Sequence, residues 1–327
     1  MKQVKLGSQG LVVSAEGLGC MGMSAFYGPS DEAENLATLA RATELGITFF
    51  DTAEIYGPFK NEILLAKAFK GKRDTVLIAT KVGSEVSDDG QRGQVNGTPA
   101  YIKKAIDRSL RHLETDYIDL YYLHRIDPKV QIEESIGALK ELVQAGKVRY
   151  IGVSEASATT IRKAHAVHPL TAVQTEYSLF ERSPESNDVL KTVNELGIGF
   201  VSYSPLGRGF LTGRLQTSDL KADDFRRTMY PRLADENIAQ NQAIVDRITA
   251  VATSKGVTPG QIALAWTMAQ GTTPIPGTRR VKYLEENAAA ADVELTADDL
   301  TALDRAAPVG AAAGDRYIAA GMSALNH

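Results

Sequence analysis

Short apolar runs alternate with amphipathic stretches along almost the whole chain. The apolar runs cover residues 17–21, 47–50, 76–80, 118–123, 148–153, 172–175, 199–203 and 273–276. Apolar residues recur at helical spacing between them, most clearly in segments 31–45, 99–113, 132–145 and 157–166. Gly46, Gly146 and Gly197 each follow a helical stretch, which is the usual C-cap position. The pattern therefore predicts strands that alternate with helices.

Strands of this kind are typical of a parallel sheet that helices cover. Each run is apolar on both faces, and a longer segment separates it from the next run. Eight such units in one chain fit a closed barrel better than an open, doubly wound sheet. We therefore expect an α/β fold of the (β/α)8 TIM-barrel type.

Three segments fall outside this repeat. Residues 4–14 read as an N-terminal β-hairpin, because two short apolar runs flank a turn with two glycines. The polar stretch 214–237 predicts an inserted loop, and two extra helical segments follow it before the eighth strand. The Ala- and Gly-rich segment 306–327 predicts a mobile tail. No linker rich in Pro, Gly or Ser divides the chain, so residues 1–327 are expected to form a single domain.

Composition narrows the range of function classes. The chain of 327 residues has 36 Lys plus Arg against 40 Asp plus Glu, and this balance argues against binding to nucleic acid or a membrane surface. No apolar run approaches the roughly 18 residues of a membrane span, and the N-terminus lacks a signal-peptide core. The single cysteine, Cys20, excludes an intrachain disulfide, and no residue cluster has metal-ligand spacing. We expect a soluble, cytoplasmic protein without a metal site.

Ionisable side chains stand where several predicted strands end. In a parallel barrel the functional residues lie at this C-terminal face. Asp51, Lys81 and His124 each follow an apolar run directly, and Tyr56 comes shortly after Asp51. Singly, each has an ordinary structural explanation: a turn cap, a lysine that reaches solvent, a packed histidine or a surface tyrosine. Because all four belong to one rim, we expect them to form one site.

These four residue types together suit proton transfer without a nucleophile. A tyrosine, with an ordinary pKa of about 10, releases its proton more easily when an ammonium group stabilises the phenolate. A carboxylate beside that ammonium keeps it charged despite burial. A histidine orients a substrate oxygen by donating a hydrogen bond.

Several short motifs in a fixed order carry a family resemblance. They are Asp51-Thr52-Ala53 with Tyr56-Gly57, Thr80-Lys81, YIDLYYLH at 117–124, Gly152-Val153-Ser154, SYSPLGRG at 202–209 and Pro276-Gly277-Thr278. From about residue 4 to 307 the chain resembles the aldo-keto reductase superfamily. The details GCMGMS, LHRID, EYSLFER and PIPGT resemble the branch of perakine reductase and the auxin-induced-protein-like reductases, together with bacterial aldehyde and ketone reductases. The resemblance implies NADPH-dependent reduction of aldehydes or ketones to alcohols.

The resemblance also implies a role for each motif residue. Tyr56 is implied as the proton donor, with Lys81 and Asp51 tuning it and His124 orienting the carbonyl. Ser154 and Gln174 are implied to hold the nicotinamide carboxamide, beside a stacking Tyr203. The other implied cofactor residues are Gly22 and Met23 beside the nicotinamide, Ser204, Leu206, Gly207 and Gly209 along the pyrophosphate, and Gly277, Thr278, Arg279, Tyr283, Glu286 and Asn287 towards the adenosine.

A basic cluster after the eighth strand bears on the choice of cofactor. Arg279, Arg280 and Lys282 stand where a helix begins, and a helix N-terminus offers free amides and a positive dipole to a phosphate. The acidic residue that would bind an unphosphorylated ribose is missing there. The cluster thus favours NADPH, although a solvated basic face is the alternative interpretation.

Substrate residues are expected in the loops of the same rim. Tyr27, Phe59, Arg125 and Tyr230 are the candidates, and they are joined by Phe26, the polar loop 84–98 and Tyr317. The aromatic residues suggest flat or aromatic carbonyl compounds. Arg125, beside His124, favours a substrate with an acidic group or else pairs with Asp127.

Two other function classes fit parts of this pattern. A lysine at a barrel strand end is typical of Schiff-base lyases, with Lys81 as the nucleophile. A regulatory subunit that binds NADPH with little turnover, like the potassium-channel β subunits, would keep the cofactor residues and lose activity.

Overall fold

Eight parallel strands form the centre of the molecule. The computed structural model describes residues 1–326 except 217, 219 and 222. The strands, in order around the sheet, are β3 (Leu18–Gly19), β4 (Phe49–Asp51), β5 (Leu77–Val82), β8 (Ile118–Leu123), β9 (Val148–Ser154), β10 (Ala172–Glu176), β11 (Gly199–Tyr203) and β12 (Thr273–Pro274). A parallel bridge between Gly19 and Gly277 joins the two edges of this sheet. The predicted (β/α)8 barrel is confirmed, and each predicted apolar run overlaps one of its strands.

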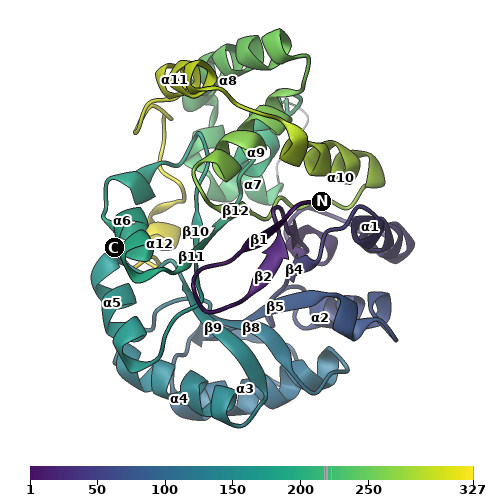
Figure 1. Cartoon of the computed structure of the whole chain (residues 1–327), viewed down its shortest axis with the longest axis vertical. Helices are drawn as coiled ribbons and strands as arrows, with labels where there is room; N and C mark the ends of the chain where they lie inside the picture. The colour runs from purple at the N-terminus through teal and green to yellow at the C-terminus, as the bar shows by residue number, and fades with distance from the viewer. Residues whose placement is uncertain (217, 219, 222, 327) are drawn as a thin grey trace.

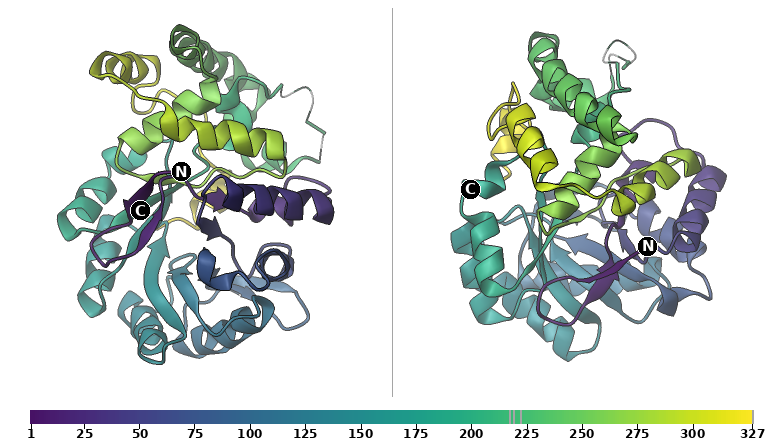
Figure 2. Two further views of the ribbon diagram at one scale, coloured as in Figure 1. Left: turned by 45° about the vertical axis from the view of Figure 1, so that its right-hand side comes forward. Right: turned by 45° about the horizontal axis from the view of Figure 1, so that its top comes forward.

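Helices surround this barrel on the outside (Figures 1 and 2). They are α1 (Glu32–Glu44), α2 (Lys60–Ala68), α3 (Pro99–His112), α4 (Ile132–Gln144), α5 (Ala158–Val167), α6 (Val189–Leu196), α8 (Asp235–Lys255), α9 (Pro259–Ala269), α10 (Val281–Ala288) and α11 (Ala297–Ala306). Side chains cap several of their N-termini, as Asp31 does for α1 and Thr258 for α9. Gly197 ends α6 in the left-handed conformation, with φ at 64°. None of the described helices has the length and apolarity to cross a membrane.

The N-terminal hairpin lies across one end of the barrel (Figure 1). Strands β1 (Gln3–Lys5) and β2 (Val12–Ser14) pair antiparallel, close to the predicted boundaries. Leu6, Leu11 and Val13 are buried in a cluster with inward-facing strand residues such as Phe49 and Leu120. Because the hairpin fills this end with apolar side chains, the opposite rim is the one open to ligands.

Two segments predicted as loops contain regular structure. The stretch 214–237 includes helix α7 (Phe225–Met229), a 3-10 turn (Pro231–Leu233) and the start of α8. The polar loop 84–98 forms an antiparallel hairpin of β6 (Ser84–Val86) and β7 (Arg92–Val95).

The segment 306–327, predicted to be a mobile tail, makes specific contacts with the barrel over the part that the structure describes. The tail packs back on the barrel and includes helix α12 (Ala319–Met322). Its Arg316 is only 5% exposed, and it donates hydrogen bonds to the buried carboxylate of Glu155 and to the Tyr203 hydroxyl. Asn326 bonds to the backbone of Glu155 and Ser157. The Ala- and Gly-rich composition of this segment does not predict these contacts.

Candidate active site

The four ionisable residues predicted at the rim lie together. Asp51 ends β4, Lys81 lies near the end of β5, His124 follows β8, and Tyr56 lies in the turn between β4 and α2. The Lys81 Nζ donates hydrogen bonds to Asp51 Oδ1 at 2.5 Å, to the Thr52 carbonyl at 2.7 Å and to the Tyr56 hydroxyl at 3.3 Å. The Tyr56 and His124 rings meet edge to face, with their centroids 6.0 Å apart. The Tyr56 hydroxyl thus faces the lysine, and its ring lies beside the histidine.

Burial and charge oppose each other in this group. Burial alone would lower the pKa of Lys81, but Asp51 and Tyr56 stabilise the ammonium and raise it above its usual range. Burial raises the pKa of Tyr56, Lys81 opposes that shift, and the net effect keeps the phenol protonated. The resting site therefore holds a charged lysine beside a neutral tyrosine.

His124 is held in its neutral form. Burial lowers its pKa well below the usual value, and the nearby charges of Arg125 and Lys81 lower it further. Its Nδ1 lies 3.3 Å from the Ser84 hydroxyl, which comes from the β6–β7 hairpin. The hairpin therefore orients the imidazole.

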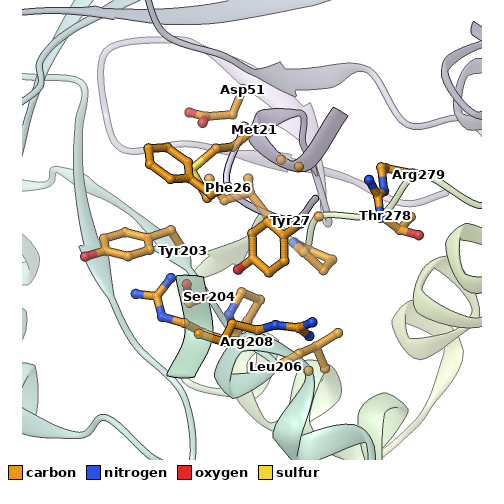
Figure 3. Close-up of a pocket in the computed structure, with 18 of the residues that line it drawn as sticks. Met21, Phe26, Tyr27, Asp51, Tyr203, Ser204, Leu206, Arg208, Thr278 and Arg279 are labelled. Carbon is orange, nitrogen blue, oxygen red and sulfur yellow. The ribbon is translucent and has the colours of Figure 1, made fainter. Parts of the chain in front are cut away.

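A cavity of about 920 Å³ runs from this group across the rim to the start of α10. Figure 3 shows Asp51 and Tyr203 on one side of it and Thr278 and Arg279 on another. The sequence-predicted residues that line it are Gly22, Phe26, Tyr27, Asp51, Tyr56, His124, Arg125, Ser154, Gln174, Tyr203, Ser204, Leu206, Gly209, Tyr230, Gly277, Thr278, Arg279, Arg280, Tyr283, Glu286, Asn287 and Tyr317. The barrel thus brings side chains from all along the chain to one elongated cavity.

Four predicted site residues do not line this cavity: Lys81, Met23, Gly207 and Phe59. Lys81 lies behind Asp51 and Tyr56 and reaches the site only through them. Met23 is buried in the core, and Met21 of the same 3-10 turn lines the cavity instead. Gly207 lies against Phe180, whose side chain would be 3.1 Å from an added Cβ.

The structure places Phe59, which was predicted as a substrate residue, outside the lining of the cavity. Its backbone has a positive φ of 64°, at the start of α2. Its ring packs against the His112 ring with centroids 4.7 Å apart, and the Arg108 guanidinium covers it at 4.7 Å. Phe59 therefore belongs to the packing between α2 and α3.

The far end of the cavity is positively charged and open to a phosphate. Within the described residues, the Arg279 side chain donates only to the carbonyls of Gly28 and Pro29, and it has no carboxylate partner. Helix α10 begins after Arg280 without a side-chain cap. Glu286, expected near the adenine, instead accepts hydrogen bonds from Arg214 at 2.7 Å and Thr258 at 2.9 Å.

The two side chains implied to hold the nicotinamide carboxamide already make hydrogen bonds within the protein. Gln174 donates from Nε2 to the second carboxylate oxygen of Asp51, at 2.7 Å. Ser154 Oγ accepts from Arg125 Nη1 at 3.3 Å. Both side chains lie on the cavity wall, and their remaining polar atoms suit an amide ligand.

The sequence missed a polar network beside Tyr203. The Tyr203 hydroxyl bonds to Tyr317 at 2.9 Å and accepts from Arg316 at 3.0 Å. Arg208 donates to Tyr317 and to Glu176, each at 2.9 Å. The tail thereby fixes the tyrosine that the resemblance placed against the nicotinamide. The one signal in the sequence for this network is that Arg316 directly precedes Tyr317, a predicted substrate residue.

The residues of the cavity fit a dinucleotide along its length. Gly209 has a φ of 96°, which favours glycine, and an added Cβ would meet no atom within 4 Å. Backbone at the glycine-rich turn is therefore open to close approach by a ligand. Such a turn suits a pyrophosphate, and the uncapped start of α10 with Arg279 suits a further phosphate.

The fold and the buried Tyr–Lys–Asp–His group define an oxidoreductase of the barrel class. The sequence model of the Aldo/keto reductase family matches residues 17–308, and the chain therefore belongs to that family. Family membership implies NAD(P)H-dependent carbonyl reduction and small carbonyl substrates.

Solved structures support the same assignment. The chain is similar to the glycerol dehydrogenase AKR11B4 from Gluconobacter oxydans, with 27% identity, a TM-score of 0.84 and coverage of 93% of this chain and 94% of that one. It is similar to the aldo-keto reductase AKR11C1 from Bacillus halodurans in its holo form, with 27% identity, a TM-score of 0.79 and coverage of 95% and 97%. A thermostable aldo-keto reductase, Tm1743, solved with the inhibitor epalrestat, shows 28% identity, a TM-score of 0.76 and coverage of 94% and 100%.

Proposed function

We propose that this protein reduces aldehydes or ketones to alcohols with NADPH, and that Tyr56 donates the proton. The observation that carries the proposal is the contact between the Lys81 ammonium and the hydroxyl of Tyr56, a residue that lines the large cavity. When bound, the reduced nicotinamide supplies the hydride. The chain itself must orient the carbonyl, supply a proton and exclude water.

Tyr56 is in the protonation state that reduction requires. Its raised pKa keeps the proton on the phenol at neutral pH. As the carbonyl oxygen gains negative charge, the phenol proton moves to it and the phenolate forms beside Lys81 Nζ. The Asp51 carboxylate, 2.5 Å from the same ammonium, keeps that cation charged and fixed.

His124 orients the carbonyl oxygen in this proposal. Its lowered pKa keeps the imidazole neutral, so it acts as a hydrogen-bond donor and Tyr56 remains the acid. In this proposal the Ser84 hydroxyl, 3.3 Å from Nδ1, donates to that nitrogen, and the imidazole proton is carried on Nε2 towards the substrate.

The cofactor residues follow from the lining of the cavity. Ser154 and Gln174 would hold the carboxamide, Tyr203 would stack on the ring, and the turn of Ser204 to Gly209 would follow the pyrophosphate. Arg279 would bind the 2′-phosphate, because its guanidinium faces only carbonyl oxygens within the described residues.

The two rival classes are less compatible with these contacts. A Schiff-base lyase needs a neutral lysine, but Asp51 and Tyr56 raise the pKa of Lys81 and favour its charged form. A regulatory subunit needs no proton donor, yet Tyr56 lies on the cavity wall within reach of both Lys81 and His124.

The test is NADPH consumption, followed by absorbance, with a panel of aldehydes and ketones. Tyr56→Phe removes only the proton donor, so we expect kcat to fall about 100-fold or more. The Kd for NADPH, measured by fluorescence titration, should change little. Loss of NADPH binding in Tyr56→Phe would instead mean that Tyr56 has a structural role. Turnover that persists in Tyr56→Phe would remove the proposed acid.

A further inference from the structure

Most arginines that line the cavity are matched with a carboxylate. The matched pairs are Arg208 with Glu176 at 2.9 Å, Arg214 with Glu286 at 2.7 Å, Arg226 with Asp224 at 2.9 Å and Arg280 with Glu34 at 3.9 Å. Among the described residues, Arg125 and Arg279 have no such partner. Arg279 lies at the end proposed for the 2′-phosphate, so an anion is expected there. Arg125 lies at the opposite end, beside His124.

The hydrogen bonds of Arg125 leave part of its guanidinium free. Nη1 donates to the carbonyl of His124 at 2.7 Å and to Ser154 Oγ at 3.3 Å. Nε and Nη2 make no hydrogen bond within the described part of the chain. An arginine presents these two N–H groups side by side, in the geometry that matches a carboxylate.

Asp127 does not neutralise Arg125. One oxygen of this carboxylate accepts a hydrogen bond from the backbone N–H of Gly97 at 2.9 Å, and the other accepts from Lys129 N–H at 2.9 Å. Asp127 therefore serves the loops behind the rim. The alternative interpretation of Arg125 as the partner of Asp127 is thus wrong.

An unmatched cation on the cavity wall is costly unless a ligand supplies its counter-charge. The neighbouring carboxylate Glu155 is already paired with Arg316 at 2.7 Å. The positive charge of Arg125 therefore remains available beside His124, where a carbonyl is proposed to bind.

We infer that Arg125 binds a carboxylate of the substrate, so that the preferred substrates are aldehyde acids or keto acids. This inference rests on the proposed function and deepens it by naming the substrate class. In this arrangement the carbonyl oxygen of the substrate lies at Tyr56 and His124. The carboxylate of the same molecule then accepts hydrogen bonds from Nε and Nη2 of Arg125, the residue that follows His124. Binding of the acid group then fixes the carbonyl in register for reduction.

A matched pair of substrates tests this inference. 4-Carboxybenzaldehyde and its methyl ester have the same aldehyde and ring, and they differ in charge. We expect the wild-type protein to show the higher kcat/KM for the acid. Arg125→Met keeps an unbranched apolar side chain and removes the charge. The ratio of kcat/KM for acid over ester should fall about 10- to 100-fold, the loss expected for hydrogen bonds to a charged group.

Two further variants serve as controls. Arg226→Met removes an arginine of the same cavity that is already paired with Asp224, so the acid-to-ester ratio should be unchanged. Arg125→Lys keeps the charge without the paired N–H groups and should retain part of the preference for the acid.

The possible results distinguish a failure of this inference from a failure of the proposed reductase function. If Arg125→Met lowers the rates for acid and ester equally, Arg125 only positions His124 and Ser154, and the inference is overturned. A wild-type protein that reduces the ester but prefers it to the acid overturns the inference alone. No NADPH consumption with either aldehyde, or with the wider panel, overturns the proposed function and the inference with it.

Discussion

Lys81 and Asp51 are both almost fully buried, at 0% and 3% exposure. Burying either charge alone would cost several kcal/mol, but the pair is compensated by short hydrogen bonds to Thr52 and Gln174. Asp51 and Lys81 could be predicted as site residues because each is an ionisable group directly after an apolar run, at the rim where a barrel carries its functional residues. The directions of Met23 and Phe59 could not be predicted, because they depend on local turns that periodicity does not determine.

The protonation states of two residues lead to a prediction about pH. The raised pKa of Tyr56 keeps it protonated as pH rises, and the lowered pKa of His124 keeps it neutral as pH falls. Neither group changes its charge between about pH 6 and about pH 8. We therefore expect kcat for carbonyl reduction to be flat over this interval when NADPH is saturating. An inflection near the ordinary histidine pKa, absent in His124→Gln, would contradict this.

At the scale of elements, the site is assembled from strand ends and then fixed by segments outside the barrel. The β6–β7 hairpin brings Ser84 to His124, and α7 brings Phe225 against Phe26, with ring centroids 4.6 Å apart. The strand ends could be predicted from the apolar runs. These added contacts could not, because hairpin 84–98 and tail 306–327 are polar or rich in small residues and carry no periodic signal.

The tail offers the sharpest test at this scale. Arg316 connects the tail to Glu155 and to the Tyr203 hydroxyl, so Arg316→Ala leaves a buried carboxylate unpaired. We expect the free energy of unfolding to fall by about 3 kcal/mol. The Kd for NADPH, from fluorescence titration, should rise several-fold because the Tyr203 hydroxyl loses one of the two hydrogen bonds that hold it.

Two variants separate stability from positioning. Arg316→Lys keeps the charge beside Glu155 and should restore most of the stability and part of the NADPH affinity. Arg305→Ala changes an exposed arginine of α11 and should alter neither. If Arg316→Ala lowers stability while the Kd for NADPH and kcat stay at wild-type values, the tail has no positioning role.

The whole molecule follows from the alternation of strands and helices, which is why the barrel could be predicted. Closure depends on a contact between Gly19 and Gly277, which are far apart in the sequence, and only the count of eight units anticipated it. The cavity is a property of the closed barrel as well, since its walls come from residues between Gly19 and Tyr317. A ligand along its length therefore contacts both ends of the chain and should stabilise the fold globally.

This global coupling predicts how NADPH and NADH differ in their effect on thermal unfolding. At 100 times its Kd, NADPH should stabilise the wild-type protein by about 2.7 kcal/mol. Arg279→Ala removes the proposed 2′-phosphate contact and should weaken NADPH about 10- to 100-fold. The same NADPH concentration then contributes only about 1.4 to about 0.4 kcal/mol. Stabilisation by NADH should not change, because NADH has no phosphate at that position.

Arg280→Ala, next in sequence but facing Glu34, should have a smaller effect. Equal weakening of both cofactors in Arg279→Ala would mean that the 2′-phosphate binds elsewhere.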